Sequence, residues 1–419
     1  MEIRMIKKPN LMSPVGNFES LAAAIKAGAD SVYFGVGKLN MRSRSSINFT
    51  LKDLEKIVKT CKKAGVKTYL TLNTVMYDED LSEIKKICDA AKKSGIDAVI
   101  ATDIAVIEYC NKIKLSVHMS TQTNISNIDA VKFYSKYADV IVLARELNLE
   151  QIAKIINQIK KEKIKGKNGE LIKIEIFIHG AMCVSISGKC SMSLALYNKS
   201  ANRGECLQTC RRKFLVKDKE TGDELEIDNE YIMSPKDLCT IRFLDKLIEA
   251  GVDVFKIEGR GRSADYVYKV VSAYRKAIDE YFNKTLTKEK IKDYEKELST
   301  VFNRGFWHGG YYLGNKLGEW SGSYGSKAEI EKHFIGIVKH YFPKAKIAEL
   351  EMQKESLKIG DEILITGDVT GVINCKITSI YKNEKPVNSV KKSDEDVTIK
   401  VPEKVRKNDK IYVLKRRKE

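Results

Sequence analysis

Four cysteines in the middle of the chain are the residues whose type and spacing most suggest chemistry. Cys183, Cys190, Cys206 and Cys210 fall within 28 residues, separated by six, fifteen and three residues. Only the last gap resembles the short spacing of a structural zinc site. An iron–sulfur cluster accepts wider and irregular gaps, because thiolates from a folded-over loop can reach its separate irons. The residues alone favour such a cluster but leave a zinc site and metal-free thiols open.

The glycines and basic residues around these cysteines suit a folded loop that binds an anion. Gly180, Gly188 and Gly204 give the backbone freedom to turn around a ligand. The stretch is also basic, and its positive charges would lower the pKa values of the thiols and attract an anion. The basic residues are Lys189, Arg203, Arg211, Arg212 and Lys213. A cysteine protease would pair Cys183 with His179, although nothing in the spacing favours that pair.

The scaffold for these residues is a repeat of a helix followed by a short apolar strand. Several joints share a glycine and then an aspartate, as in Gly28 to Asp30, Gly95 to Asp97 and Gly251 to Asp253. Glycine ends a helix in the left-handed conformation, and a buried parallel strand reads as a continuous apolar run. The predicted strands are residues 10–13, 31–35, 67–73, 98–101, 115–119, 140–144, 174–178 and 254–258.

Eight such units predict an α/β fold, a (β/α)8 TIM-like barrel. An open doubly wound sheet would need an early glycine-rich phosphate loop, and the segment Leu11–Gly16 is not one. In a barrel, the residues that follow each strand meet at one rim. We expect His118, His179 and Glu258 to be candidates for proton transfer there. Five further polar residues are expected to bind an anionic substrate: Asn73, Gln122, Arg145, Arg260 and Arg262.

The connection after the seventh strand is abnormally long. It runs from His179 to about Ser234, whereas such connections usually have only a few residues, and long loops are usually functional. This loop contains the four cysteines. The segment Ser234–Cys239 that follows is expected to begin the next helix.

The last third of the chain changes character. Helices are predicted over 265–282 and 288–300, followed by an aromatic and glycine-rich segment, Val301–Tyr312, that would stack an unpaired base or pack on the barrel. Short strands then predict a small all-β barrel. We therefore divide the chain into a (β/α)8 barrel at 1–285 with the cysteine loop at 179–234, a helical and aromatic linker at 286–327, and a C-terminal β-barrel domain at 328–419.

Composition limits the partners and the compartment. The chain has 74 Lys and Arg against 56 Asp and Glu, a net charge of +18, which suits a polyanionic partner such as RNA. Lysines on solvated helix faces would give the same surplus. No apolar run is long enough to cross a membrane, and the N-terminus lacks the apolar core of a signal peptide. We expect a cytoplasmic protein with no membrane association and with reduced thiols.

Several segments, in order along the chain, resemble peptidase family U32. They are Ser13–Asn17, Glu175–Cys183, Ser187–Ser193, Asn202–Arg211, Ser234–Leu238 and Lys256–Ser263. The resemblance covers essentially the whole chain and is greatest to the tRNA hydroxylation branch of the family. It implies oxygen-independent formation of 5-hydroxyuridine from the wobble uridine of tRNA, linked to prephenate. It also implies that the four cysteines of the loop bind a 4Fe–4S cluster, and a paralogous protein is a further expected partner.

Prephenate is a dicarboxylate, which suits the planar forks of arginine side chains at the rim. Two alternatives remain from other classes of protein. One is a collagenase-like peptidase with Cys183 as nucleophile, and the other is a non-catalytic RNA-binding factor. Substitution of Cys206 or Cys210 should abolish the function of a cluster protein and spare a Cys183 protease.

Overall fold

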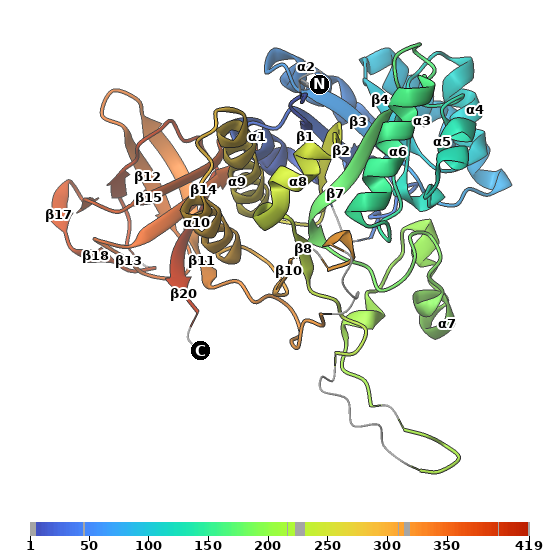
Figure 1. Ribbon diagram of the computed structural model, residues 1–419. Helices are drawn as coiled ribbons and strands as arrows, with labels where there is room; N and C mark the ends of the chain where they lie inside the picture. Colours follow the sequence, from blue (N-terminus) through green and yellow to red (C-terminus); the bar gives the residue numbers. More distant parts are fainter. Residues whose placement is uncertain are drawn as a thin grey trace.

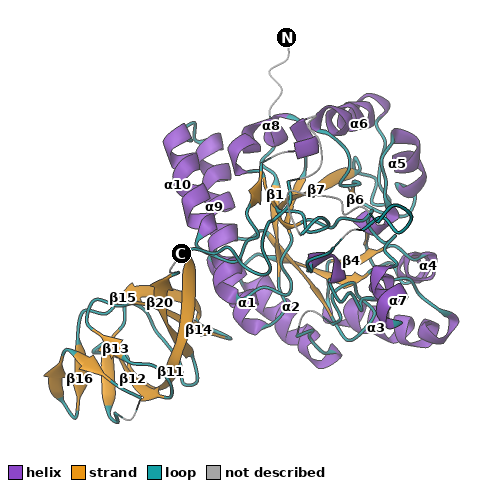
Figure 2. Cartoon of the chain, turned by 90° about the horizontal axis from the view of Figure 1, so that it is seen from below, coloured by secondary structure: helices purple, strands orange, loops and turns teal. Residues whose placement is uncertain are grey.

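The computed structural model describes residues 6–44, 47–215, 217–222, 231–308, 310–313, 319–392 and 394–417 (Figure 1). A barrel surrounded by helices lies beside a smaller all-β domain (Figure 2). Among the described residues, no helix combines the length and the apolar character that crossing a membrane requires.

Eight parallel strands close into a barrel, as the repeat predicted. Neighbours follow chain order, and the last strand pairs with both its predecessor and β1, which closes the ring. The strands are β1 (Asn10–Pro14), β2 (Ser31–Gly35), β3 (Lys67–Leu72), β4 (Ala98–Ala101), β5 (Val117–Met119), β6 (Val140–Val142), β7 (Lys173–Ala181) and β9 (Val254–Ile257). The prediction of all eight strands is confirmed.

Helices cover the outside of the barrel (Figure 2). They are α1 (Phe18–Lys26), α2 (Leu54–Lys63), α3 (Leu81–Ser94), α4 (Ile104–Lys112), α5 (Ile128–Tyr134), α6 (Leu149–Glu162), α8 (Leu244–Glu249) and α9 (Ala264–Phe282). In α3 the buried residues are Ile84, Ile87, Cys88 and Ala91. This spacing of three or four places them on one face, which packs against the strands.

The repeated glycine and aspartate at the joints have a structural reason. Gly95 ends α3 in the left-handed conformation, with φ of 80°. The aspartate that follows accepts a hydrogen bond from a backbone N–H in the preceding barrel strand. Asp30 accepts from Leu11 at 2.7 Å, Asp97 from Thr68 at 2.7 Å and Asp253 from Ile174 at 2.9 Å. The joint therefore ties each incoming strand to its neighbour.

Two short strands lie outside the closed ring. β7 extends beyond the barrel, and β8 (Asp237–Cys239) pairs antiparallel with its last residues, while β10 (Phe306–Trp307) pairs with β8. The prediction that Ser234–Cys239 begins a helix is therefore wrong. The overhanging end of β7 offers unpaired N–H and C=O groups, and the chain returning from the cysteine loop pairs with them as a strand.

The cysteine loop and the linker contain little regular structure. The loop holds α7 (Met192–Tyr197) and two 3₁₀ turns, Ala201–Arg203 and Thr209–Arg211. Part of the predicted loop, residues 223–230, lies outside the described residues, as do residues 314–318 of the predicted linker. In that linker, α10 (Lys288–Ser299) confirms the predicted helix. The exact domain limits stay predictions.

The C-terminal region is all-β, as predicted. Eight of its strands form one antiparallel sheet in the order β15-β14-β20-β11-β12-β19-β16-β17, and β13 pairs with β18. One apolar core lies between them. The strands are β11 (Ile330–Phe342), β12 (Ile347–Met352), β13 (Leu357–Lys358), β14 (Glu362–Gly367), β15 (Gly371–Lys376), β16 (Ile380–Lys382), β17 (Lys385–Val387), β18 (Ser389–Val390), β19 (Val397–Lys400) and β20 (Lys410–Arg416).

The all-β domain is docked firmly on α1 and α9. Leu364 and Val372 of its sheet belong to the same apolar core as the barrel helices. Ion pairs of 2.7 Å flank this contact, one between Lys26 and Glu403 and one between Lys410 and Glu19. The two parts therefore share a continuous apolar interface with a charged rim.

Candidate functional site

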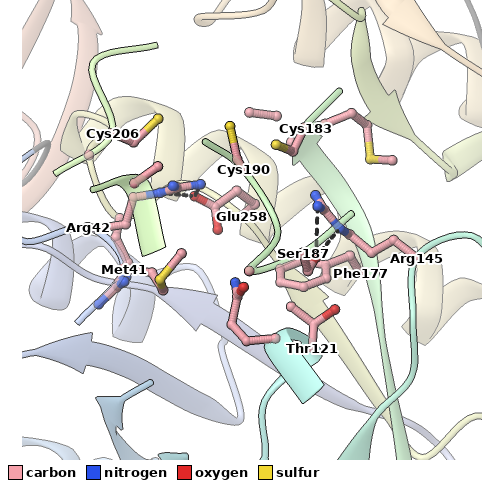
Figure 3. A pocket seen from close by; sticks show the side chains of 18 of the residues that line it. Met41, Arg42, Thr121, Arg145, Phe177, Cys183, Ser187, Cys190, Cys206 and Glu258 are labelled. Carbon is pink, nitrogen blue, oxygen red and sulfur yellow. Dashed lines mark hydrogen bonds and ion pairs between the residues drawn. The ribbon is translucent and has the colours of Figure 1, made fainter. Parts of the chain in front are cut away.

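The carboxyl ends of the barrel strands open into a cavity of about 220 Å³ (Figure 3). The cysteine loop and the loops that follow the strands line it together. Eleven of the twelve predicted site residues line this cavity, and only His118 does not. The eleven are Asn73, Gln122, Arg145, His179, Cys183, Cys190, Cys206, Cys210, Glu258, Arg260 and Arg262. The structure thus brings them together, while their individual roles stay predictions.

The four cysteines face a common space. Cys183 is exposed and the other three are partly buried. Burial raises the pKa of Cys210 to about 11, Arg211 opposes the rise, and Cys183, Cys206 and Cys190 add to it. The expectation that nearby basic residues lower the thiol pKa values is therefore wrong for Cys210, because burial outweighs the one arginine. The other three sulfurs therefore lie near enough to Cys210 for negative charge on them to hinder its ionisation.

The cysteine loop is anchored to the barrel loops on one side through Arg203. Its guanidinium donates to the Val75 carbonyl at 3.0 Å, pairs with Asp80 and lies 4.0 Å from the centroid of the Tyr77 ring. The next residue, Gly204, has φ of 86° and accepts a hydrogen bond from Ser43 Oγ at 3.1 Å. These contacts fix the chain just before Cys206.

A second anchor joins the loop to the strand ends on the other side. Arg145, which follows β6, donates from Nε and Nη2 to Ser187 Oγ at 3.2 and 2.9 Å. The Ser187 carbonyl accepts from Asn124 Nδ2 at 2.8 Å. Figure 3 shows Arg145 and Ser187 close together beneath Cys183. Ser187 thus sits between two polar residues of the barrel and places the segment between Cys183 and Cys190.

The two ends of the loop are held together at its base by Arg211. The guanidinium donates to the Met182 carbonyl, beside Cys183, and to the Pro235 carbonyl at 2.7 Å, where the loop returns to the barrel. It also donates to Ser234 Oγ at 3.1 Å. Arg211 therefore closes the loop directly beside the last cysteine.

Glu258 is the one carboxylate among the described side chains that line the cavity, and two arginines keep it ionised. Arg42 approaches its Oε1 with Nε at 3.0 Å and Nη2 at 2.9 Å, and the Tyr33 hydroxyl lies 3.3 Å from Oε2. Burial raises the pKa of Glu258, but Arg42 and Arg260 outweigh this effect and hold it below the ordinary value. At neutral pH Glu258 can therefore accept a proton but has none to donate.

The arginines of the cavity differ in how much of their hydrogen-bonding capacity is already used. Arg260 is buried and donates to Thr71 Oγ1 at 2.6 Å and Asn40 Oδ1 at 3.1 Å, and burial lowers its pKa to about 10. Arg262 instead stacks 3.4 Å from the centroid of the Phe302 ring. Arg260 mainly holds the loop after β2, whereas Arg262 keeps donors for a ligand.

Both predicted histidines are buried and neutral. His179 lies at the edge of the cavity with Nδ1 3.4 Å from the Tyr274 hydroxyl, and burial lowers its pKa to about 3. His118 lies deeper in the barrel against Tyr69, with ring centroids 4.5 Å apart, and its pKa is likewise lowered to about 3 by burial and then by Lys256. His118 is thus separated from the cavity in which proton transfer was expected.

Other residues of the cavity were not predicted from the sequence. They are Tyr33, Arg42, Lys256 and Arg304, whereas Arg211 was expected among the basic residues of the cysteine loop. A signal existed for Lys256, because it lies on β9 two residues before Glu258, which follows the strand directly, and side chains two apart along extended chain share a face. Arg42 had no such signal, since it lies in an irregular loop 216 residues from its partner Glu258.

Comparison with known proteins identifies relatives that are similar in sequence to this chain. A protein named collagenase from Porphyromonas gingivalis (strain W83) is 52% identical over 409 residues, which is 98% of each chain. The tRNA hydroxylation protein P1 of Bacillus subtilis is 34% identical, covering 86% of this chain and 84% of that protein. The 23S rRNA 5-hydroxycytidine C2501 synthase of Escherichia coli is 36% identical over 64% of this chain and 39% of that protein.

The family model described as Peptidase family U32 matches residues 16–322. This match includes the barrel from α1 onward, the cysteine loop and nearly all of the linker. With the relatives that align along most of its length, it establishes that the chain belongs to peptidase family U32.

Proposed function

We propose that the protein is an RNA-modifying enzyme that hydroxylates the wobble uridine of tRNA at carbon 5, without molecular oxygen and with prephenate as a linked co-substrate. Relatives named for tRNA hydroxylation and for rRNA hydroxycytidine synthesis support the class of reaction. The observation that carries the proposal is one cavity lined by four thiols and six arginines. This combination suits redox chemistry on an anionic substrate.

The proposal includes a 4Fe–4S cluster bound by Cys183, Cys190, Cys206 and Cys210. Among the residues that the structure describes, no three His, Cys, Asp or Glu side chains converge on one point as ligands of a single ion. A mononuclear zinc site needs all its sulfurs about 2.3 Å from one ion, whereas a cluster takes each thiolate on a different iron. Four cysteines that line one cavity could each bind a different iron of such a cluster. When bound by all four cysteines, the cluster would supply or accept electrons.

The cavity also fits the substrates proposed. Its volume of about 220 Å³ suits a single base or a small acid. A target base would have to leave its stack to enter the barrel mouth. The donors left on Arg145 and Arg262 suit the carboxylates of prephenate or a phosphate of the RNA. Glu258, held ionised by Arg42, is the candidate proton acceptor.

The first test is the metal content of protein purified without oxygen. We expect about four irons and four acid-labile sulfides per chain. Cys206→Ser should lose them. Cys375→Ser, which removes an equally half-buried thiol from the C-terminal domain, is the matched control and should keep them. Stoichiometric zinc, or no metal together with a reactive Cys183 thiol, would overturn the cluster.

The second test is the modified nucleoside itself. Nucleosides of tRNA from a deletion strain should lack 5-hydroxyuridine in mass spectrometry. The wild-type chain and Cys375→Ser should restore it, and Cys206→Ser should not. If Arg262→Ala abolishes the modification while tRNA binding persists, a purely RNA-binding role is excluded as well.

A peptidase is the second candidate, because a relative with 52% identity is named collagenase. The exposed Cys183 thiol would be its nucleophile. Its expected base, His179, is bonded to Tyr274, and in the described part of the chain no hydrogen bond joins His179 to Cys183. Gelatin cleavage that is lost in Cys183→Ser but survives Cys206→Ser and Cys210→Ser would favour the peptidase over the hydroxylase.

A further inference from the structure

The floor of the cavity carries a charged side chain that the proposed function does not use. Lys256 lines the cavity from inside the barrel, and only 5% of its side chain is exposed. It pairs in register with Phe177 on the neighbouring strand. Its ammonium lies 2.6 Å from Oε1 of Glu175, which is completely buried two residues before Phe177 and therefore one layer deeper.

An ion pair at this depth needs an explanation other than stability. The interior of such a barrel is usually filled with branched apolar side chains. Replacing both members of a buried ion pair with apolar residues is often neutral or even stabilising, because two charges no longer have to leave water. Lys256 and Glu175 therefore add little to the stability of the fold that a layer of apolar side chains would not also provide. Their place against a ligand cavity points to binding.

The ammonium also has hydrogen-bonding capacity to spare. It carries three protons, and in the described residues Glu175 is its one hydrogen-bond acceptor. Its other near neighbours are aromatic faces, with the centroids of Tyr33 and Phe177 at 4.4 and 5.6 Å. Such faces attract a cation but do not replace an oxygen acceptor. The Lys256 ammonium at the floor can therefore donate a hydrogen bond to an oxygen atom of a ligand.

The walls around the ammonium define the shape of its ligand. Ile100 and Val142 line the cavity together with Tyr33 and Phe177, and Ile100 belongs to the same buried cluster as Tyr33. These apolar side chains suit a flat, uncharged ring with one oxygen at its inner edge. The two charges of a dicarboxylate match the arginines nearer the mouth better than this single cation. A nucleobase with carbonyl oxygens matches the floor.

We propose that Lys256 contacts the flipped base directly, donating a hydrogen bond to a carbonyl oxygen of a pyrimidine ring that lies against Phe177 and Tyr33. Glu175 is then a positioning residue that holds the ammonium in place. The inference rests on the proposed function and deepens it, because it states how the barrel recognises the base that enters.

Binding of two RNA hairpins to the full-length protein tests this role. One is a dye-labelled tRNA anticodon stem-loop with unmodified uridine at the wobble position, and the other is abasic at that position. Fluorescence anisotropy gives the ratio of their dissociation constants, which measures the contribution of the base. Wild-type protein should prefer the uridine hairpin. Lys256→Met should reduce this preference about tenfold or more, the usual loss for one charge-assisted hydrogen bond, and leave abasic binding unchanged.

Two further variants separate recognition from folding. Lys256→Met/Glu175→Leu removes both charges, so that no buried charge is left without a partner, and it should keep the melting temperature but lose the base preference. Glu175→Gln leaves the lysine and an amide oxygen near it, so it should keep the preference. A purely structural ion pair predicts that Lys256→Met and Glu175→Gln do similar damage to the melting temperature and that neither alters the preference.

The outcomes distinguish this inference from the function on which it rests. If wild-type protein binds neither hairpin, the proposed function fails and the role of Lys256 fails with it. If wild-type protein prefers the uridine hairpin and the double variant keeps that preference, only the role of Lys256 is overturned. Titration calorimetry with succinate, a simple dicarboxylate, tests whether the floor binds a small acid instead of a base. If the double variant loses succinate binding but keeps the base preference, the floor belongs to the acid and the inference is wrong.

Discussion

Glu258 is the residue whose charge state the cavity controls most directly. Its pKa is raised by burial, but Arg42 and Arg260 reverse the effect and hold it below the ordinary value of 4.5. A carboxylate with a depressed pKa stabilises the folded state above the pKa of the unfolded chain. That contribution is lost as the pH falls through the folded pKa. Glu258 should therefore stabilise the fold at neutral pH and lose this effect in acid.

We expect Glu258→Gln to lower the free energy of unfolding by about 3 kcal/mol at pH 7, because it leaves the Arg42 guanidinium without its counterion. The difference from wild type should shrink progressively below pH 4.5, the ordinary carboxyl value. Urea unfolding between neutral and acidic pH measures it. Glu150→Gln, which breaks the solvent-exposed pair with Lys154, is the control and should have a much smaller effect. A difference for Glu258→Gln that is constant with pH would contradict this account.

Single residues were predictable from the sequence where they follow a regular element. Asn73 and Glu258 come directly after a buried strand, Arg145 comes three residues after the end of β6, and all three line the cavity. His118 belongs to β5 itself, so its side chain points into the barrel below the cavity. Arg42 is reached only through tertiary structure, because its partner lies 216 residues away.

At the scale of elements, the cysteine loop depends on a close approach at Gly204. A Cβ there would lie 2.3 Å from the Asn40 carbonyl oxygen and 2.4 Å from Ser43 Oγ, and φ is 86°. Any side chain therefore pushes the segment before Cys206 away from the loop after β2. Position 204 has to be glycine for steric as well as conformational reasons.

We expect Gly204→Ala to displace Cys206 and to lower the iron retained after anaerobic purification, in addition to destabilising the fold. Gly169→Ala is the matched control, since Gly169 has φ of 82° and nothing within 4 Å of the added Cβ. It should cost only about 1 kcal/mol of strain in the free energy of unfolding, without loss of iron. Equal iron content in the two variants would show that the contact with Asn40 does not position the cysteines.

The regular elements were predictable to different degrees for physical reasons. The barrel strands are buried on both faces and follow a repeated joint, so the sequence pattern marks all eight. β8 was mistaken for a helix start because it exists only by pairing with the overhang of β7. In the C-terminal domain, β13, β16, β17 and β18 have two or three residues each, too few for an alternating pattern to show.

At the scale of the whole molecule, the C-terminal domain brings a basic end to the mouth of the barrel. Lys332 of β11 donates to Ser263 Oγ at 3.0 Å at the start of α9, just beyond the cavity residue Arg262. β11 pairs with β20 so that Ile330 faces Arg416. The end of β20 therefore lies on the same side of the molecule as the cysteine loop, as Figure 1 shows. Lys418 and Glu419 of the basic tail lie outside the described residues.

The net charge of +18 does not by itself say where an RNA would bind. A pair of charge reversals distinguishes docking at the mouth of the barrel from a diffuse attraction to the whole protein. Arg416 is exposed on the mouth side and forms no ion pair with the described residues, whereas Lys63 is exposed at the end of α2, on the opposite face of the barrel. Arg416→Glu and Lys63→Glu change the net charge equally, so a diffuse attraction predicts equal losses of tRNA affinity.

A docked RNA predicts unequal losses. We expect Arg416→Glu to weaken tRNA binding several-fold at moderate salt and to reduce the slope of log K against log salt by about 0.7 to 0.9, the contribution of one phosphate contact. Lys63→Glu should leave both quantities nearly unchanged, because the phosphates would lie farther than a Debye length of about 10 Å from that face. Anisotropy titrations over a range of salt concentrations measure both quantities. If the slopes of log K against log salt are equal for the two variants, RNA does not dock at the mouth. Only the diffuse attraction of RNA to a basic protein would then explain the binding.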